Sequence, residues 1–340
     1  MTNLELYVEK LIETKTVEHI AISVGKGDAV LFETYRSGGK KIDDKTLFDM
    51  ASVTKILSVT PIALIALDNK LISLEEKVSD FFDFNIIDDY KNLKIINLLT
   101  HTMGIGHEDL TKENVTYDNA AEYILNIPAE IPVGSDVKYS CPAFILLGVI
   151  LEKVYGKQLD VLAENMVFSP LKMQSTRYKP EERNNIVNFN LSEDNRGLVN
   201  DYNARYLGGV AGNAGVFSNM TDMKKFAKML SETGGSIIPD RIFDIARKNH
   251  TQGMSEARGL GFLYVDEEYK QTGGCFSIGS IGHCGHTGQS VFVDLKTGLY
   301  VIIMSDATIS TIKKYGHERY ELVEKMREDI HNAIKKDLRI

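Results

Sequence analysis

Cysteine is scarce in this sequence of 340 residues, which contains Cys141, Cys275 and Cys284 and no other thiol. Three cysteines cannot all pair with one another, so the chain need not contain a disulfide framework. Reduced thiols suit the cytoplasm. At this length the chain can bury a sizeable core, either in one large domain or in two interlocked ones.

An excess of positive charge and a leading apolar segment are also missing. The formal net charge is −8 and no basic cluster occurs, which disfavours nucleic acid and anionic membrane surfaces as partners. The first twenty residues carry Glu5, Glu9 and Glu13 in an amphipathic pattern, without the apolar core of a signal peptide. We expect a cytoplasmic protein as the sequence is given, or an exported one if a signal segment was trimmed.

What the sequence does contain is the run Phe48-Asp49-Met50-Ala51-Ser52-Val53-Thr54-Lys55, with a serine and a lysine three residues apart. On a helix such residues share a face, so the Lys55 amine can reach the Ser52 hydroxyl and accept its proton. The uncharged run Ile56–Leu67 follows, and its length fits a core helix and is too short for a membrane span. At the head of that helix Lys55 would be partly desolvated, which lowers its pKa. A capping serine with a surface lysine is the structural alternative.

The same spacing occurs elsewhere, and local context separates those pairs from Ser52 and Lys55. Most of them lie in a strand-like run, before glycines, before a proline or in a polar terminal helix: Ser23/Lys26, Ser37/Lys40, Ser135/Lys138, Ser169/Lys172 and Ser310/Lys313. Only Ser52 begins a buried helix, so we predict that Ser52 is a nucleophile with its base one turn away.

Hydrophobic periodicity predicts strands near both ends of the chain. Before the nucleophile we expect a helix over Leu4–Ile12 and a hairpin of strands Ile20–Val24 and Ala29–Tyr35 around a glycine-containing turn. From about Gly259 the strand pattern returns, at Ser290–Leu295 and Leu299–Ser305. A charged helix is predicted from about Thr311 to the end.

Between these strands the pattern is mainly helical, from Ser52 to about Thr233. One predicted helix spans Asp222–Leu230, with Thr221 as its N-terminal cap and Gly234-Gly235 as its stop. No linker, repeat or low-complexity tract interrupts the chain.

Two further motifs follow the nucleophile in order, Tyr139-Ser140-Cys141 and His286-Thr287-Gly288. With Ser52 and Lys55, they give the chain a resemblance to the serine β-lactamase and penicillin-binding protein superfamily, in its class C-like serine hydrolase branch. That branch carries S-x-x-K, then Tyr-x-Asn, then a Lys-Thr-Gly or His-Thr-Gly strand. Further matches extend over nearly the whole chain: Thr46–Phe48, Leu98–Thr102, Leu146–Gly148, Pro170–Met173 and Gly209–Ser218.

The resemblance implies an α+β fold of the β-lactamase/transpeptidase type. An antiparallel sheet is built from both chain ends with flanking helices, and a mainly helical insertion interrupts it. On this basis the sheet domain is expected at residues 1–50 and 259–340 and the helical domain at residues 51–258. The active site would lie in the cleft between them.

The resemblance also implies a role for each matching residue. Ser52 would be the acylated nucleophile and Lys55 its proton acceptor or electrostatic partner. Tyr139 would return a proton to the leaving group and activate water, although its local sequence taken alone favours a core tyrosine. His286 would lie beside Tyr139 and tune its pKa. The backbone N–H groups of Ser52 and Gln289 would form the oxyanion hole. The implied substrate-binding residues are Cys141, Thr287, Gly288, Gln289 and Asn213.

The chain departs from the family pattern at two positions. Cys141 stands where the family usually has an asparagine that hydrogen-bonds the lysine and the substrate, and a thiol is a weaker partner. His286 stands where many β-lactamases have lysine, and an imidazole supplies positive charge only when it is protonated. Both departures weaken the case for β-lactams and for peptidyl substrates that carry a carboxylate.

Neither a metal nor another cofactor is predicted. The segment His283-Cys284-Gly285-His286 has zinc-ligand side chains, but alternation along a strand sends His283 and Cys284 to opposite faces. The glycine-rich Gly208–Gly215 lacks the spacing of a nucleotide-binding loop. His101-Thr102-Met103-Gly104 mimics the His-Thr-Gly motif and is interpreted as a turn at a helix end.

Three functions from different classes remain open. The first is a serine hydrolase that cleaves esters or small amides through an acyl-enzyme on Ser52. The second is a D-alanyl-D-alanine carboxypeptidase, penicillin-binding protein or β-lactamase, and the third is a non-catalytic relative that binds a ligand. The expected partner is a small-molecule or peptidyl acyl substrate, and the protein is expected to be a monomer or small homo-oligomer.

Overall fold

The computed structural model describes residues 1–340 except 112–114, 182–184, 188–196 and 308–317. Its largest element is a six-stranded sheet in which every neighbouring pair is antiparallel, in the order β2-β1-β9-β8-β7-β6. The strands are β1 (His19–Lys26), β2 (Ala29–Ser37), β6 (Leu263–Tyr264), β7 (Ile281–Cys284), β8 (Ser290–Val293) and β9 (Leu299–Ser305). The N-terminal hairpin therefore pairs directly with the last strand of the chain.

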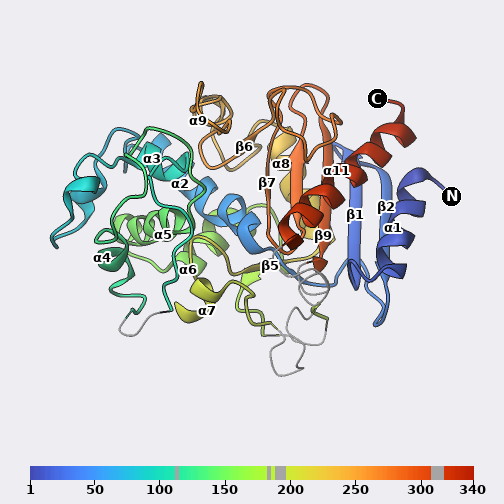
Figure 1. Ribbon diagram of the computed structural model, residues 1–340, viewed down its shortest axis with the longest axis horizontal. Coiled ribbons are helices and arrows are strands. Elements are labelled where there is room, and N and C mark those ends of the chain that lie inside the picture. Colours follow the sequence, from blue (N-terminus) through green and yellow to red (C-terminus); the bar gives the residue numbers. More distant parts are fainter. Residues whose placement is uncertain (112–114, 182–184, 188–196, 308–317) are drawn as a thin grey trace.

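Helices cover both faces of this sheet. Helices α1 (Asn3–Glu13) and α11 (Arg319–Leu338) pack together on one face, and both chain ends lie on that side (Figure 1). Helix α8 (Met220–Ser231) packs on the other face, against β1, β8 and β9. The side chains of β9 alternate accordingly, with Val301 and Ile303 in the core under α1 and α11, and Ile302 in the core on the α8 side.

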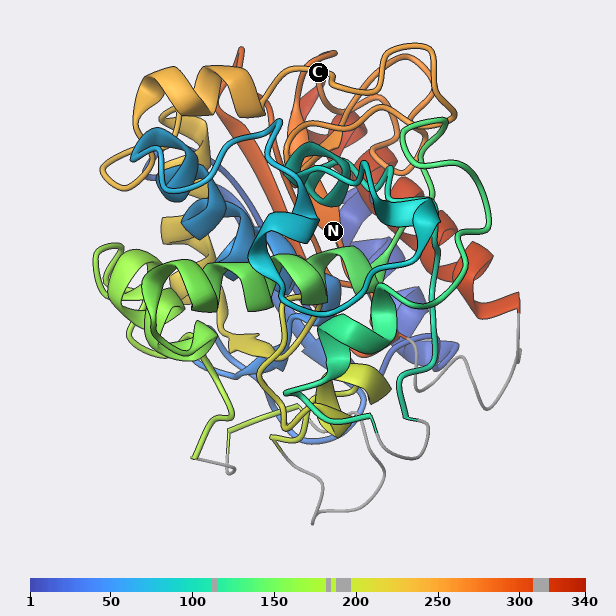
Figure 2. The ribbon, with the colours of Figure 1, turned by 90° about the vertical axis from the view of Figure 1, so that its left-hand side faces the viewer.

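The middle of the chain is mainly helical and lies to one side of the sheet (Figure 1), the side that faces the viewer in Figure 2. Its α-helices are α2 (Thr60–Asp68), α3 (Ile95–Leu99), α4 (Ala120–Ile124), α5 (Cys141–Tyr155), α6 (Leu159–Ala163), α7 (Tyr202–Tyr206) and α9 (Asp240–Ala246). Short 3-10 segments are η1 (Ala51–Val53), η3 (Val78–Phe81) and η4 (Asp88–Tyr90), and π-helical segments are η2 (Lys55–Val59) and η5 (Glu164–Phe168). A three-stranded sheet, β3 (Phe48–Asp49), β5 (Val216–Ser218) and β4 (Arg177–Tyr178), lies at its base.

The predicted α+β class is confirmed, because both chain ends build one antiparallel sheet around a helical insertion. The predicted strand Leu299–Ser305 has the observed bounds of β9. The predicted boundaries of the helical domain, residues 51–258, stay a prediction. Helix α8 lies within that range, but it packs on the sheet. For the terminal helix, residues 318–340 are described, whereas its predicted start at Thr311 and the Ser310/Lys313 pair lie outside the described residues.

Thr221 is not the cap of α8, contrary to our prediction. The N-cap is Asn219, whose side-chain oxygen accepts from the backbone N–H of Asp222 at 3.0 Å. Thr221 lies inside the helix, and its hydroxyl donates to the Asp44 carboxylate at 2.9 Å. A tertiary contact therefore uses the hydroxyl that the local pattern assigned to capping.

The helix that follows Ser52 is buried, as the sequence indicates. It runs as η1, η2 and α2, and residues Ile56, Leu57, Val59 and Ile62 are fully inaccessible. The stretch Ala51–Asp68 has the length and hydropathy of a membrane span, but 83% of it is buried inside the fold. It therefore serves as the central core helix of this structure.

Candidate active site

Ser52 lies in a tight turn between β3 and the core helix. The preceding residue, Ala51, has φ +46°, which is the left-handed region that disfavours residues with a Cβ. The buried carboxylate of Asp49 holds this turn, since it accepts from the N–H of Ala51 at 2.8 Å and from that of Asn200 at 2.6 Å. Ser52 itself is 9% exposed, so its hydroxyl lies at the edge of the core.

Lys55 joins the predicted catalytic residues. Its side chain is completely buried, and its Nζ donates to Ser52 Oγ at 2.9 Å and to the Tyr139 hydroxyl at 2.8 Å. A third bond at 3.0 Å reaches the backbone carbonyl of Asn213, and Cys141 Sγ lies 3.7 Å away. The three N–H donors of an ammonium thus have three oxygen acceptors.

Aromatic and cationic groups surround Tyr139, which is 37% exposed while its hydroxyl contacts buried Lys55. The ring centroid of His101 lies 4.6 Å from that of Tyr139, and the ring of His283 lies at 6.2 Å. The guanidinium of Arg258, itself 3% exposed, lies 5.6 Å from the same ring. His101 Nδ1 also accepts from the N–H of Ser140 at 3.0 Å, which fixes the backbone beside Tyr139.

Our expectation of a lowered lysine pKa is wrong. Burial alone lowers the pKa of Lys55, but the neighbouring Cys141 thiol and Tyr139 hydroxyl favour the ammonium and raise that pKa above its ordinary value. Burial likewise raises the pKa of Tyr139, and the ammonium of Lys55 offsets only part of that rise. The resting site therefore contains a lysine cation beside a neutral tyrosine.

His286 has a hydrogen-bond partner that the sequence did not predict, and its expected place beside Tyr139 stays a prediction. Its Nε2 donates to the side-chain oxygen of Asn200 at 2.7 Å, while the imidazoles recorded beside the Tyr139 ring are His101 and His283. Burial lowers the pKa of His286 to about 4. This imidazole is therefore neutral at neutral pH and supplies no positive charge for a substrate carboxylate.

The other residues of the His-Thr-Gly segment are built into the sheet edge. The Thr287 and Gln289 side chains are fully buried, and Thr287 donates to Gln289. The Gln289 amide donates to the Asp49 carbonyl at 2.7 Å, which ties this edge to the nucleophile turn. Gly288 has φ +98°, and a Cβ there would lie 2.1 Å from Ser305 Oγ. Contacts with a substrate are thus left to the backbone of this segment.

The glycine-rich loop brings Asn213 to Lys55. A Cβ on Gly212 would lie 1.9 Å from the Phe144 carbonyl, so only glycine allows the loop to approach α5 this closely. The Asn213 side chain is fully buried and donates to the Asp201 carboxylate at 3.0 Å. Its contact with the site is therefore its backbone carbonyl, and it does not present an exposed amide to substrate.

Sequence reasoning missed several residues of the site. They come from segments far apart in the chain, and they are His101, His107, Asn200, Asp201, Arg258 and His283. His101 has φ +57° just after α3, so the predicted turn at a helix end is present, but its ring also packs on Tyr139. No local pattern marked Arg258 or Asn200, because their roles depend on tertiary contacts.

The structure also shows the contacts of His283 and Cys284, whose side chains are of the kinds that bind zinc. His283 Nδ1 donates to the Cys284 carbonyl at 2.8 Å, whereas Cys284 Sγ lies 3.5 Å from the Tyr269 hydroxyl. These two side chains therefore have separate partners. A cluster of Glu18, His19 and Asp306 lies where β1 begins and β9 ends, and there Asp306 accepts from the backbone N–H groups of Glu18 and His19 and from the imidazole. We interpret these contacts as a structural tie.

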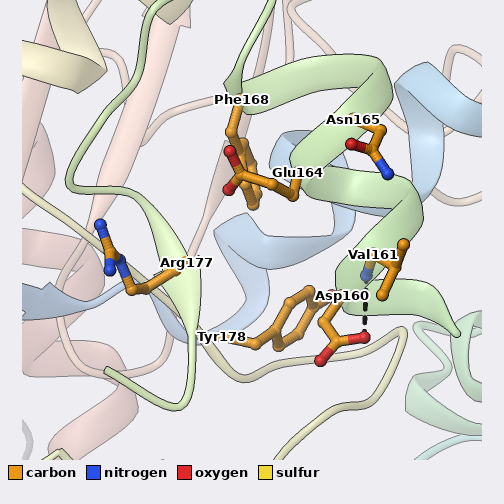
Figure 3. Close-up of a pocket in the computed structure, with 7 residues that line it drawn as sticks. All are labelled: Asp160, Val161, Glu164, Asn165, Phe168, Arg177 and Tyr178. Atoms are coloured by element: carbon orange, nitrogen blue, oxygen red, sulfur yellow. Dashed lines mark hydrogen bonds between the residues drawn. The ribbon is translucent and has the colours of Figure 1, made fainter. Parts of the chain in front are cut away.

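A surface pocket of about 450 Å³ lies away from these residues, between α6, η5 and β4 (Figure 3). Its polar lining includes Asp160, Glu164 and Arg177. Tyr178 at its base donates to Ser58 Oγ at 3.1 Å, on the inner side of the nucleophile helix. None of the predicted catalytic residues lines this pocket.

Comparison with known proteins agrees with this arrangement. Over 304 residues the chain is 25% identical to an N-acetylmuramyl-L-alanine amidase of Bacillus subtilis, covering 78% of this chain and 69% of that protein. It is 26% identical over 310 residues to a Salmonella agona protein provisionally named D-alanyl-D-alanine carboxypeptidase, covering 78% and 71%. The structure of EstCE1, a hydrolase with promiscuous acyltransferase activity, shares the fold, with a TM-score of 0.73, 19% identity and 97% of each chain covered. The sequence profile of the β-lactamase family matches residues 4–322, so the chain belongs to that family and is a serine hydrolase.

Proposed function

We propose that the protein hydrolyses esters or small amides through an acyl-enzyme on Ser52. The observation that carries the proposal is the single buried ammonium of Lys55, which bonds Ser52 Oγ at 2.9 Å and the Tyr139 hydroxyl at 2.8 Å. A structural lysine would not need to meet both a serine at the edge of the core and a partly exposed tyrosine. This geometry fits the pairing of a nucleophile with an oriented acid and base.

The first step starts from the minor form of the enzyme in which Tyr139 is a phenolate: Ser52 Oγ attacks the carbonyl carbon, and its proton passes to the Tyr139 oxygen. The tyrosine hydroxyl hydrogen-bonds Ser52 as well as Lys55, so the path of the proton is short. Tyr139 then gives the proton to the leaving alcohol or amine. In the second step the Tyr139 phenolate takes a proton from water, which attacks the acyl group, and Tyr139 returns that proton to Ser52 Oγ as the acid leaves.

Lys55 acts electrostatically in this scheme. As an ammonium it cannot accept the serine proton, but it stabilises the phenolate form of Tyr139, which must be present before Tyr139 can accept that proton. Negative charge on the carbonyl oxygen would be met by the backbone N–H groups of Ser52 and Gln289. The bond from the Gln289 side chain to the Asp49 carbonyl braces these two segments against each other.

The charge of the site favours neutral acyl substrates. Neutral His286 offers no cation to a carboxylate, and Cys141 replaces the amide that would hold a peptide or β-lactam. A carboxypeptidase or β-lactamase activity is the second candidate, and the amidase and carboxypeptidase names of the relatives favour it. In both readings the partner is a small-molecule or peptidyl acyl substrate.

The test is hydrolysis of p-nitrophenyl butyrate and of a chromogenic cephalosporin by wild type and Ser52→Ala. Ser52→Ala should abolish ester cleavage and the gain of one acyl group in the intact mass of the quenched enzyme. Ser169→Ala is the matched control, because it changes another serine of an S-x-x-K pair, one whose hydroxyl only contacts Glu164. Full activity in Ser52→Ala would reject the proposal, and Ser52-dependent cleavage of the cephalosporin alone would move it to the second candidate.

A further inference from the structure

Cys141 lies at the centre of the site and has no part in the scheme above. It is the first residue of α5, after the N-cap Ser140, and its side chain is 5% exposed. Its Sγ lies 3.7 Å from Lys55 Nζ, the atom that also contacts the nucleophile. The thiol is therefore within reach of the same positive charge that organises Ser52.

A second side chain that can carry positive charge approaches the thiol from another segment. The side chain of His107 hydrogen-bonds Cys141. The segment that carries His107 is anchored to α7, because Leu110 N–H donates to the Asn203 side chain at 2.9 Å, and that side chain donates to the Glu108 carbonyl at 2.7 Å. His107 itself is exposed, so this pair connects the interior of the site with solvent.

The charges around Cys141 favour its thiolate. Burial raises the pKa of the Cys141 thiol, but the Lys55 ammonium and the His107 hydrogen bond lower it more, against opposition from Asp201. The positive end of α5 acts in the same direction. The hydrogen bond to Cys141 in turn raises the pKa of His107.

The other two cysteines lack this environment. Burial raises the pKa of Cys275 to about 12. Cys284 contacts the Tyr269 hydroxyl and the Gln271 side chain, and the structure records no cation within hydrogen-bond reach of its sulfur among the described residues. The chain thus offers two matched internal controls for any thiol chemistry.

Asn213, next to Lys55, has a buried side-chain acceptor without a donor in the described part of the chain. Its side chain is fully buried, yet its Oδ1 has no hydrogen-bond partner among the described residues. Its backbone carbonyl contacts the same Lys55 Nζ that Cys141 approaches. A buried acceptor without a donor costs roughly 1–3 kcal/mol, so a bound polar group that satisfied it would be stabilised.

We propose that Cys141 is a second nucleophile of the active site and a modification site for small disulfides, whose attachment blocks acylation of Ser52. The Cys141 thiolate attacks one sulfur of the disulfide, a new S–S bond forms, the old S–S bond breaks and the other half leaves as a thiolate. The enzyme thiol is oxidised to a mixed disulfide and the leaving half is reduced. The added group then occupies the space beside Lys55, and an external thiol restores the enzyme by the reverse exchange.

The experiment uses methyl methanethiosulfonate, a small probe that transfers a methylthio group and releases methanesulfinate. Peptide mapping should find Cys141 modified before Cys275 and Cys284, in wild type and in Ser52→Ala alike. Since the readout is mass and not turnover, it stands even if the proposed hydrolysis fails. Wild-type esterase activity should be lost at the rate of Cys141 modification and return with dithiothreitol, whereas Cys284→Ser should behave like wild type.

The pH dependence separates a thiolate from an ordinary buried thiol. An ordinary thiol of pKa about 8.5 reacts about eightfold more slowly at pH 7 than at pH 8, and for Cys141 the decrease should be smaller than that. His107→Asn should slow modification of Cys141 at pH 7 by about threefold or more. Modification of Cys284 or Cys275 ahead of Cys141, or equal rates in His107→Asn and wild type, would overturn the proposal.

Discussion

Lys55→Met removes the ammonium from the centre of the site while keeping the length of the side chain. The wild-type Nζ donates to Ser52 Oγ, to the Tyr139 hydroxyl and to the Asn213 carbonyl at 2.9, 2.8 and 3.0 Å, and all three bonds are lost. A positioned acid–base group contributes about 10²–10⁴-fold to rate, and Lys55 holds two of the reacting groups. We therefore expect kcat/KM for p-nitrophenyl butyrate to fall about 10³-fold, which is about 4 kcal/mol of transition-state stabilisation.

The same substitution should leave the fold nearly as stable as before. The unpaired Asn213 carbonyl costs about 1–3 kcal/mol, whereas removing a fully buried charge relieves a desolvation penalty of similar size. We expect the free energy of unfolding in urea to stay within about 2 kcal/mol of wild type. Lys172→Met is the matched control, since Lys172 is the exposed lysine of another S-x-x-K pair and should keep full activity.

Two results would refute this reasoning. If Lys55→Met kept more than about a tenth of the wild-type kcat/KM, the ammonium would not organise the transition state. If the variant unfolded in the absence of denaturant, loss of activity would report loss of structure, and the balance between desolvation and hydrogen bonding would be wrong.

Three further predictions test other parts of the site. Tyr139→Phe should lower kcat for the ester about 10²-fold or more with KM within about threefold, and a loss confined to KM in steady-state kinetics would exclude a role in proton transfer. Burial raises the pKa of Asp49 to about 6 in the folded protein. Protonated Asp49 therefore adds up to about 3 kcal/mol to the free energy of unfolding below about pH 4, and this contribution is lost as the pH rises through about 6. In urea titrations, the free energy of unfolding should decrease from pH 4 to pH 7 in wild type and should decrease less in Asp49→Asn. Gly288→Ala should destabilise the fold by about 2 kcal/mol or more in urea, whereas Gly27→Ala, which also has positive φ but no atom within 4 Å of its Cβ, should cost only about 1 kcal/mol.

The fold was largely predictable because its signals are local. Alternating apolar residues identified the hairpin β1–β2 and the last strand β9, and all three pair within one sheet. The cap of α8 was mispredicted because two polar residues, Asn219 and Thr221, precede Asp222, and only their tertiary surroundings decide which one caps. Local sequence therefore located the elements better than it located their ends.

The contact between Ser52 and Lys55 could be predicted for a similar reason. Three-residue spacing brings two side chains together wherever a helical turn forms, and η1 supplies that turn between Ser52 and Lys55. The match to family motifs added Tyr139, which is remote in sequence but contacts Lys55. His101, Arg258 and Asn200 belong to no pattern of this kind, because each is brought in by packing of distant segments.

The protonation state of Lys55 shows where sequence reasoning reaches its limit. Burial could be read from the apolar run after Lys55, and burial alone argues for a neutral amine. The sign of the pKa shift depends on what else is buried at the same point, and here Tyr139, Cys141 and the Asn213 carbonyl come from two other segments to favour the cation. The replacement of an amide by Cys141 therefore changes more than substrate contacts, since it exchanges a neutral neighbour of Lys55 for one that can carry negative charge. In this enzyme the residue that departs from the family pattern is also the one that helps keep its lysine protonated.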